Sequence, residues 1–432
     1  MQKLTKYNVN FFQGKINENT PYFLFQRPGQ PIHIRASFLA GSRFDTIPGI
    51  AHFLEHMLLA GSKKFPNKRL LAIPLENIGG SIGGITNNDF ITITLEIAGK
   101  KDLLLALDIL NEVINNPLFN EETIENERGS ILAEQQMGYH NRGRHVMDVA
   151  NALVYQKTPY AKVTIGNIDS IKSITGEDLK NYYRDFFKKN PLSWSISGDI
   201  DEKEIIALLA PLHTSTVSTE EIITGELPIV REESQALEIF EDDRADIYFG
   251  FRTDSAKSVD TYSLAVISSY LAQGRGSKLQ DELRYKRGLI YGIRGDYLFS
   301  FDAGEWYLAT GCLVKNAQKI LDVITEELAL IKKTGISDAE LRLVKNKIIQ
   351  NNILKMQTAE SWSKMSDKAA FIVSPEKYLI SNFEEGIEKV TAQSIIEVAN
   401  KYFKSDNWYL AMCGSKSLEN ISVNIKPGVK QE

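Results

Sequence analysis

The pattern of apolar and polar residues divides the chain into two similar series of predicted elements. Each series opens with a segment that alternates like a half-buried strand and continues with an apolar stretch at helical spacing. Gly-rich turns, a second strand and a long amphipathic helix follow in each. In chain order these segments are 31–44, 48–60, 91–97 and 102–114 in the first half, and 245–253, 259–272, 305–313 and 317–331 in the second.

One more helix in each half begins with residues that cap helices well, Asn-Glu-Glu at 120–122 and Ser-Asp-Ala at 337–339. The offset between them (337 − 120 = 217) indicates an internal duplication. Strand runs beside long helices predict an α+β fold of two homologous α/β-sandwich domains, each an antiparallel-rich sheet packed by helices. A polar, Ser/Thr-rich stretch near 215–235 is the expected linker, so the domains are predicted at 1–220 and 221–432.

Composition and charge exclude several classes of protein. Of 432 residues, 43% are apolar and 24% charged, as in ordinary soluble proteins, and the net charge of −5 gives no basic surface for nucleic acid or anionic membrane. No apolar run reaches the about 18 residues of a membrane span, and the first ten residues lack the apolar core of a signal peptide. Cys312 and Cys413 lie in apolar segments and are predicted to be buried thiols. We therefore expect a cytoplasmic protein.

The strongest chemical signal is the sequence His-Phe-Leu-Glu-His at 52–56, inside the predicted apolar helix. His52 and His56 are four residues apart, so both imidazoles project from one face of a helix. Both can reach one tetrahedral Zn²⁺ at ~2.0–2.1 Å. Glu55 lies near the same face, where a carboxylate can take a proton from a water molecule at the metal. The order H-x-x-E-H occurs in a family of metallopeptidases.

A third ligand is needed, because catalytic zinc usually takes three protein ligands. A lone His on an apolar helix is usually a core residue, but burying two His and a Glu without a partner would cost several kcal/mol. The predicted helix at 120–136 offers Glu127 and Glu134, seven residues apart on one stripe. One could bind metal while the other orients a ligand or the water. Alternatively both are solvated surface charges, and periodicity does not choose between these interpretations.

Together these residues resemble the inverzincin peptidases, the family of pitrilysin, insulin-degrading enzyme and mitochondrial processing peptidase. That family pairs H-x-x-E-H with a later E-x-x-x-x-x-x-E pattern, which residues 127–134 match. The resemblance implies that His52, His56 and Glu134 hold one Zn²⁺ per chain, with Glu55 as the general base and Glu127 as a supporting carboxylate. Mn²⁺ or Co²⁺ could occupy the same ligands.

The resemblance covers nearly the whole chain and is greatest to short two-domain bacterial members that are similar to processing peptidases. In the second half Arg284 and Tyr291 fit an Arg/Tyr pair, seven apart, that contacts the substrate peptide in the family. From spacing alone, Arg284 could equally form a surface ion pair with Asp281, and a Tyr in an apolar strand is more often a core residue. One position departs from the family: Gly83 stands where an Asn usually contacts substrate.

The resemblance implies a zinc-dependent endopeptidase that cleaves small or unfolded peptides or processes a precursor peptide. Family members of this length work as dimers, in which the metal domain of one chain faces the Arg/Tyr domain of the other. We therefore expect a homodimer or a heterodimer with a sister peptidase subunit. Two alternatives are a non-catalytic partner subunit and a factor that only binds peptides. The complete set of metal-site residues argues against the first, and Gly83 leaves room for the second.

Overall fold

The computed structural model describes residues 1–18, 20–212, 217, 227–365 and 379–426, which form two compact units. Unit 1 comprises Met1–Gln136, Lys162–Thr224 and Ile353–Ile380, and unit 2 comprises Met137–Ala161, Gly225–Asn352 and Ser381–Glu432. Most of the first half of the linker predicted near 215–235 lies outside the described residues.

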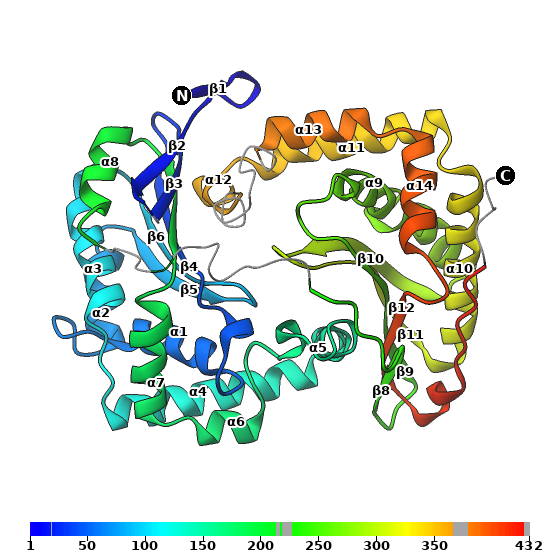
Figure 1. The fold of residues 1–432 in the computed structure, drawn as a ribbon, viewed down its shortest axis with the longest axis horizontal. Coiled ribbons are helices and arrows are strands. Elements are labelled where there is room, and N and C mark those ends of the chain that lie inside the picture. Colours follow the sequence, from blue (N-terminus) through cyan, green and yellow to red (C-terminus); the bar gives the residue numbers. More distant parts are fainter. Residues whose placement is uncertain (19, 213–216, 218–226, 366–378, 427–432) are drawn as a thin grey trace. The chain divides into compact units, whose positions relative to one another are not determined.

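Unit 1 is built on one β-sheet (Figure 1). The sheet has seven strands in the order β1-β2-β3-β7-β4-β6-β5. β3 and β7 pair in parallel and the other neighbours are antiparallel. The strand predicted at 31–44 ends early, at Phe38, where the chain turns toward the first helix. The bounds of the strands are Gln2–Leu4 (β1), Val9–Asn17 (β2), Thr20–Gln26 (β3), Ile32–Phe38 (β4), Ser81–Thr86 (β5), Ile91–Ile97 (β6) and Leu192–Gly198 (β7).

Unit 2 repeats this plan with a five-stranded sheet in the order β10-β11-β9-β12-β8. Its antiparallel and parallel pairings match those of β5-β6-β4-β7-β3 one for one. The matching strands β7 and β12 begin 216 residues apart (408 − 192), close to the predicted offset. The structure thus confirms the predicted α+β fold of two similar sandwiches. The bounds of the strands are Gln235–Ile239 (β8), Arg244–Thr253 (β9), Ile290–Phe299 (β10), Gly304–Leu313 (β11) and Trp408–Gly414 (β12).

The helices follow the predicted series in both halves. Those expected at 48–60, 102–114 and 120–136 form as α1, α3 and α4, and those at 259–272 and 317–331 as α9 and α10. The helices of the first half of the sequence are Ile50–Ala60 (α1), Lys68–Glu76 (α2), Leu103–Asn115 (α3), Glu121–His140 (α4), Arg142–Val154 (α5), Ile168–Ser173 (α6), Gly176–Tyr182 (α7) and Glu202–Leu209 (α8). Those of the second half are Asp260–Ala272 (α9), Ala317–Thr334 (α10), Asp338–Lys355 (α11), Ala359–Lys364 (α12), Ile380–Lys389 (α13) and Ala392–Tyr402 (α14).

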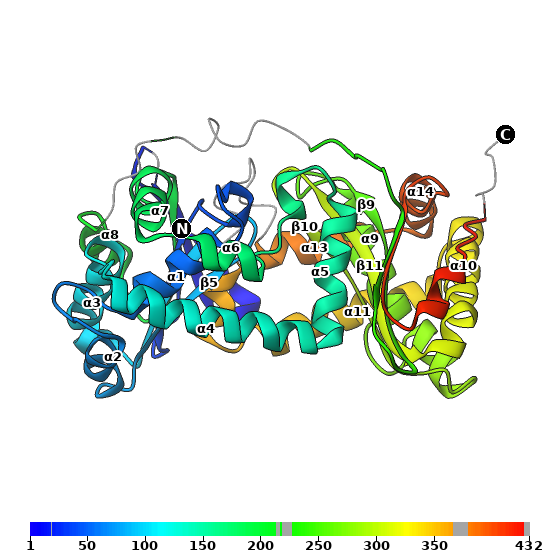
Figure 2. The ribbon, with the colours of Figure 1, turned by 90° about the horizontal axis from the view of Figure 1, so that it is seen from below.

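Each sheet is completed by a helix from the other half of the sequence. In unit 1, α12 packs on β3, β4 and β7, where Trp362 contacts Phe25 with ring centroids 5.5 Å apart. In unit 2, α5 packs on β8, β9 and β12, opposite the face that α10 covers (Figure 2). The compact units are therefore not continuous in sequence. The bounds 1–220 and 221–432 stay a prediction about the duplicated halves of the sequence.

The structure also bears on two further predictions, which concern membrane-spanning helices and the two cysteines. No helix in the described part of the chain is long and apolar enough to cross a membrane. Cys413 is buried and Cys312 is half-buried, and both are free thiols. Burial raises the pKa of each thiol to about 12, so both are poor nucleophiles near neutral pH.

Candidate metal centre

Helix α1 places the H-x-x-E-H residues at the edge of the core of unit 1. Most of its apolar side chains, among them Phe53, Leu54 and Met57, are fully buried. That packing fixes the rotation of the helix and leaves His52 and His56 on a half-buried face, with ring centroids 4.8 Å apart. The four-residue spacing therefore does what the sequence predicts: both imidazoles lie on one face.

The start of α1 is held by residues that the sequence reading missed. The buried Asp45 carboxylate accepts hydrogen bonds from the backbone N–H groups of Gly49 (2.7 Å) and Ala51 (3.2 Å). It acts as a cap for the otherwise unpaired N–H groups of the first turn. Burial raises the pKa of Asp45 to about 7, although both backbone bonds and Lys162 oppose the shift. The amino group of Lys162 donates to the Asp45 carbonyl oxygen at 2.6 Å.

Two backbone segments cross at the same point. Gly49 and Gly166 both have positive φ angles, +94° and +81°. A Cβ atom on Gly166 would lie 2.5 Å from the Pro48 carbonyl oxygen and 3.0 Å from the Gly49 Cα. Only glycine tolerates both this backbone conformation and this contact. The crossing therefore fixes the position of Gly49, the residue directly before α1 and three residues before His52.

Helix α4 brings both predicted carboxylates to the histidine pair, where they lie near different ring nitrogens. Glu134 Oε2 lies 3.7 Å from His52 Nε2 and 3.8 Å from His56 Nε2. Glu127 Oε2 lies 2.9 Å from the other ring nitrogen of His56, Nδ1. That hydrogen bond lowers the pKa of Glu127. The two glutamates are thus not equivalent. Glu134 lies near the Nε2 atoms of both histidines, and Glu127 orients the ring of His56.

The donor set suits a zinc ion. His52, His56 and Glu134 each offer one ligand atom, and these atoms lie within 4.8 Å of one another. Tetrahedral zinc with bonds of ~2.0–2.1 Å sets its ligand atoms ~3.4 Å apart, slightly closer than the two separations above. The Glu134 side chain is 34% exposed and has the freedom to close this difference. An imidazole that donates Nδ1–H to a carboxylate presents the Nε2 lone pair to a metal, as His56 can with Glu127. In the described ranges this is the one such group of three His, Cys, Asp or Glu side chains.

Glu55 is held between α1 and β5, the edge strand of the sheet. It is 8% exposed and its Oε2 accepts a hydrogen bond from the Thr86 hydroxyl at 2.9 Å. A Cβ atom on Gly84 would lie 2.4 Å from Glu55 Oε1, so the carboxylate packs directly on the backbone of β5. Burial raises the pKa of Glu55, and the Thr86 hydrogen bond opposes the shift. Gly83, the departure from the family pattern, is the preceding residue of the same strand.

Arg284 and Tyr291 lie together in unit 2. The Arg284 guanidinium carbon is 4.6 Å from the centre of the Tyr291 ring. The alternative partner, Asp281, pairs instead with Lys286 at 2.8 Å. Tyr291 is 84% exposed, so it is not a core residue. It stands at an irregularity in the pairing of β10 with β11, between Ile290 and Ile293, and such bulges re-aim side chains.

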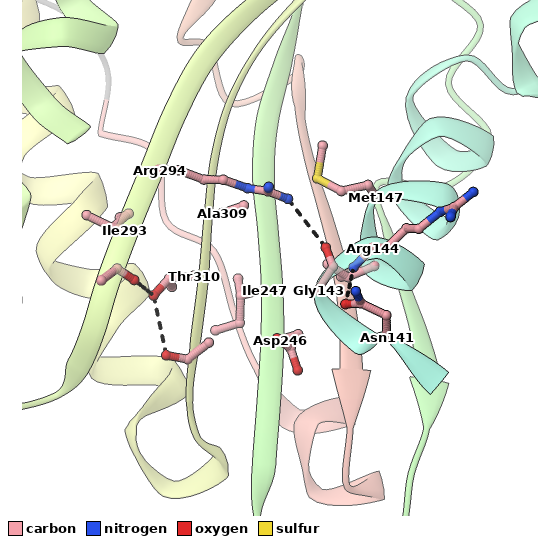
Figure 3. Close-up of a pocket in the computed structure, with 13 residues that line it drawn as sticks. Asn141, Gly143, Arg144, Met147, Asp246, Ile247, Ile293, Arg294, Ala309 and Thr310 are labelled. Atoms are coloured by element: carbon pink, nitrogen blue, oxygen red, sulfur yellow. Dashed lines mark hydrogen bonds between the residues drawn. The ribbon is translucent and has the colours of Figure 1, made fainter. Parts of the chain in front are cut away.

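Unit 2 also contains a groove of about 660 Å³ between the first turn of α5 and strands β9, β10 and β11 (Figure 3). Most of its charged side chains already form ion pairs or hydrogen bonds within the protein. Asp246 pairs with Arg244 at 2.6 Å and lies 3.7 Å from Arg142. Arg294 donates to the Gly143 carbonyl oxygen at 3.3 Å. None of the site residues predicted from sequence lines this groove.

Comparison with known proteins gives matches along most of the chain. The family model described as "Insulinase (Peptidase family M16)" matches residues 29–167, which contain the His/Glu cluster. The model described as "Peptidase M16 inactive domain" matches residues 173–348. The first match thus contains the H-x-x-E-H residues, and the second does not.

Curated relatives match at low identity over most of their length. An uncharacterized zinc protease of Mycobacterium leprae is 25% identical over 376 residues, covering 84% of this chain and 82% of that protein. The beta subunit of the human mitochondrial-processing peptidase is 25% identical over 387 residues, covering 87% and 78%. An uncharacterized zinc protease of Bacillus subtilis is 23% identical over 375 residues, covering 85% and 89%.

Solved structures share the fold of the whole chain. The "peptidase M16 inactive domain" from Pseudomonas fluorescens superposes with a TM-score of 0.85 at 19% identity, covering 97% of this chain and 100% of that one. A protease from Helicobacter pylori gives a TM-score of 0.84 at 17% identity, covering 94% and 99%. From these matches and the two-unit fold, the chain belongs to peptidase family M16, the inverzincin metallopeptidases, among its short two-domain members.

Proposed function

We propose that this chain is a zinc-dependent endopeptidase that cleaves small or unfolded peptides. The observation that carries the proposal is the cluster of His52, His56 and Glu134, whose ligand atoms lie within 4.8 Å of one another. A zinc ion bound there would polarise a peptide carbonyl and lower the pKa of a water molecule toward ~7. The relatives from Mycobacterium leprae and Bacillus subtilis, both named zinc proteases, support the choice of metal.

The protein groups around the cluster have separate roles in this proposal. Glu55 takes the proton from the attacking water and passes it to the leaving amine. Thr86 and the backbone of β5 hold the Glu55 carboxylate in place. Glu127 fixes the ring of His56 through the 2.9 Å hydrogen bond.

The substrate binds as an extended strand on β5. Within the part of the chain that the structure describes, this strand pairs with β6 alone and is the last in its sheet, so its outer edge can pair with a peptide backbone. The same strand carries Gly84 and Thr86, which contact Glu55. A peptide on this edge therefore lies beside the proposed general base. Because backbone pairing reads no side chain, it accepts unfolded peptides of varied sequence, which fits clearance or precursor processing equally.

Removal of the metal tests the proposal directly. Treatment with a zinc chelator should reduce cleavage of a quenched fluorescent peptide to background, because the ligands without metal cannot polarise the carbonyl. Added zinc should restore cleavage. His56→Ala should lose zinc by elemental analysis, and His140→Ala, which changes an exposed histidine at the end of α4, should keep it. Full cleavage after complete removal of zinc would contradict the proposal.

Arg284 and Tyr291 complete the site from a second subunit in this proposal. Tyr291 would donate a hydrogen bond to the developing oxyanion, a role that requires an accessible hydroxyl, and its side chain is 84% exposed. Since this chain carries both the His/Glu cluster and the Arg/Tyr pair, we favour a homodimer with two composite sites. A sister subunit is the alternative, which the name of the mitochondrial relative, a beta subunit, supports.

Mixing two inactive variants distinguishes these arrangements. If sites form across a homodimer, a Glu55→Gln chain mixed with a Tyr291→Phe chain should recover about one quarter of the activity, because half of the randomly formed dimers hold one intact site. Steady-state cleavage after joint refolding measures the recovery. No recovery, with both variants dimeric by light scattering, would contradict the composite homodimer.

The second candidate function is a peptide-binding partner subunit without its own cleavage. Gly83 favours it, since the family position that usually holds a substrate-contacting Asn has no side chain here. Peptide binding by metal-free protein, with no cleavage by the zinc-loaded protein, would select this alternative. For either function we place the chain in the cytoplasm. Both of its cysteines are free thiols, and a reducing compartment keeps thiols in that state.

A further inference from the structure

Strand β5 contains two consecutive glycines, Gly83 and Gly84. Glycine weakens the interior of a strand, and it often marks a place that a ligand or another backbone approaches closely. Gly84 has a reason inside the protein, since a Cβ atom there would lie 2.4 Å from Glu55 Oε1. The space around Gly83 imposes no such limit. Within 4 Å, a Cβ atom there would meet Thr94 Oγ1 alone, at 3.3 Å, and rotation of that hydroxyl relieves the contact.

The backbone does not require glycine at position 83 either. Gly83 is not among the residues with a positive φ angle, and it pairs as an ordinary strand residue with Thr94 of β6. Residues other than glycine adopt this conformation freely. Neither the packing nor the backbone of the described residues therefore explains the missing side chain, and what remains is the empty space that it leaves.

That space lies on the face of the sheet that points away from helix α1. Side chains alternate along a strand, so Gly83 and Gly84 face opposite sides, and Gly84 is the one that meets the Glu55 side chain of α1. On the Gly83 side, the neighbouring side chains of β5 are Ser81 and Ile85, and both are exposed. The row of side chains along this face thus has a gap at Gly83, with Thr94 behind it.

A peptide paired with β5 places one of its residues opposite Gly83. Directly opposite residues on paired strands carry their side chains on the same face, so this side chain lies over the gap. A flat aromatic ring can cover the bare backbone of an edge glycine, and it is long enough to reach diagonal neighbours such as the exposed Ile85. A shorter aliphatic side chain leaves more of the gap open. The gap therefore favours an aromatic residue.

We propose that Gly83 forms an aromatic-binding subsite, in which a Phe, Tyr or Trp side chain of the substrate covers the Gly83 backbone and contacts Thr94 and Ile85. This inference rests on the proposed function, because it takes β5 as the substrate-binding strand. Backbone pairing alone reads no side chain, and the subsite adds a preference to it. The preferred residue lies close to the cleaved bond, since the next residue of β5, Gly84, packs against Glu55.

A scan with matched peptides tests the subsite. Internally quenched peptides share one uncharged sequence of alanine and serine, and each carries a single Phe at a different position. A second set carries Leu instead. At one position near the cleaved bond, Phe should raise kcat/KM about fivefold over the parent peptide, and Leu there should raise it about twofold or less. Mass spectrometry of the products locates the cleaved bond.

Variants that fill the gap assign the preference to Gly83. Gly83→Val should lower the effect of Phe to about that of Leu, and Gly83→Ala, which adds a smaller group, should lower it partly. Gly99→Val adds the same side chain where the backbone is extended (φ −177°) and no heavy atom lies within 4 Å of the Cβ position. This control should keep the preference. Zinc content and urea unfolding show that each variant has kept its fold.

Three outcomes would overturn the inference alone, with the peptides still cleaved. One is equal kcat/KM for the Phe peptides and the parent at every position. The second is an equal gain with Phe and Leu. The third is a preference for Phe that neither Gly83→Ala nor Gly83→Val reduces relative to Gly99→Val. If the zinc-loaded unmodified protein cleaves none of the peptides, the proposed function fails, and the inference fails with it.

Discussion

A Glu55→Gln chain is expected to cleave peptides about a hundred- to ten-thousandfold more slowly than the unmodified chain, the usual contribution of general acid–base catalysis. Its zinc content should stay at about one ion per chain, since Glu55 is not among the three clustered ligands. The amide has the size of the carboxyl group and can still accept the Thr86 hydrogen bond. It cannot take a proton from water. Elemental analysis and a quenched fluorescent peptide, measured on the same preparation, give the two values.

A matched control guards against a general effect of removing one negative charge. Glu122→Gln changes an exposed glutamate in the first turn of α4 and should leave cleavage and zinc content unchanged. Cleavage by Glu55→Gln at the unmodified rate would contradict the role of Glu55 as general base. Loss of zinc along with cleavage would instead assign Glu55 to holding the metal.

The local part of the candidate site could be predicted because it depends on a single helix. Two histidines four residues apart share a face in any α-helix, whatever the tertiary structure. The choice between Glu127 and Glu134 is different, since both lie on one stripe of α4 and only the packing of α4 against α1 distinguishes them. From the sequence, only the family resemblance indicates that Glu134 is the ligand and Glu127 the supporting carboxylate. The distances to the ring nitrogens separate the two glutamates physically.

The contacts that position α1 were missed, and for two different reasons. Asp45 precedes the helix by five residues, whereas the usual capping signal is the residue directly before the first turn, which here is Gly49. Thr86 and Gly166 give no local signal either, because their roles depend on segments that meet α1 only after folding. Thr86 lies 31 residues from Glu55 in the sequence.

The exchange of α5 and α12 between the sheets could not be predicted either. Both helices have an apolar face, and a hydrophobic pattern says that a face is buried without saying against what. The duplication suggests that each half folds on its own sheet. The structure shows the opposite. Trp362 of α12 contacts Phe25, and Val146 and Leu153 of α5 belong to one hydrophobic cluster with the tyrosines of β9 and β12. Separately expressed halves would each lack the helix that covers one face of their sheet.

Gly166→Ala should destabilise unit 1 by about 2–5 kcal/mol, the sum of a left-handed backbone conformation and a contact that cannot relax. The new Cβ would lie 2.5 Å from the Pro48 carbonyl oxygen. The Pro48 oxygen is a backbone atom, and the position of a Cβ atom is fixed by its own backbone. No side-chain rotation therefore removes the clash. The displacement should reach Gly49, three residues before His52, and through it the first turn of α1, which contains His52. We therefore also expect zinc affinity to fall by about tenfold or more, as for loss of other groups that support metal ligands.

Gly29→Ala supplies the matched control for this prediction. Gly29 also has a positive φ, +72°, but no heavy atom lies within 4 Å of the place where its Cβ would be. It should therefore lose only the roughly 1–2 kcal/mol of the backbone conformation and keep its zinc affinity. Urea unfolding gives the stability difference, and competition with a chromophoric chelator gives the affinity. Equal losses of stability in the two variants, with unchanged zinc affinity in both, would contradict the role of the Gly49–Gly166 crossing in placing the metal-binding helix.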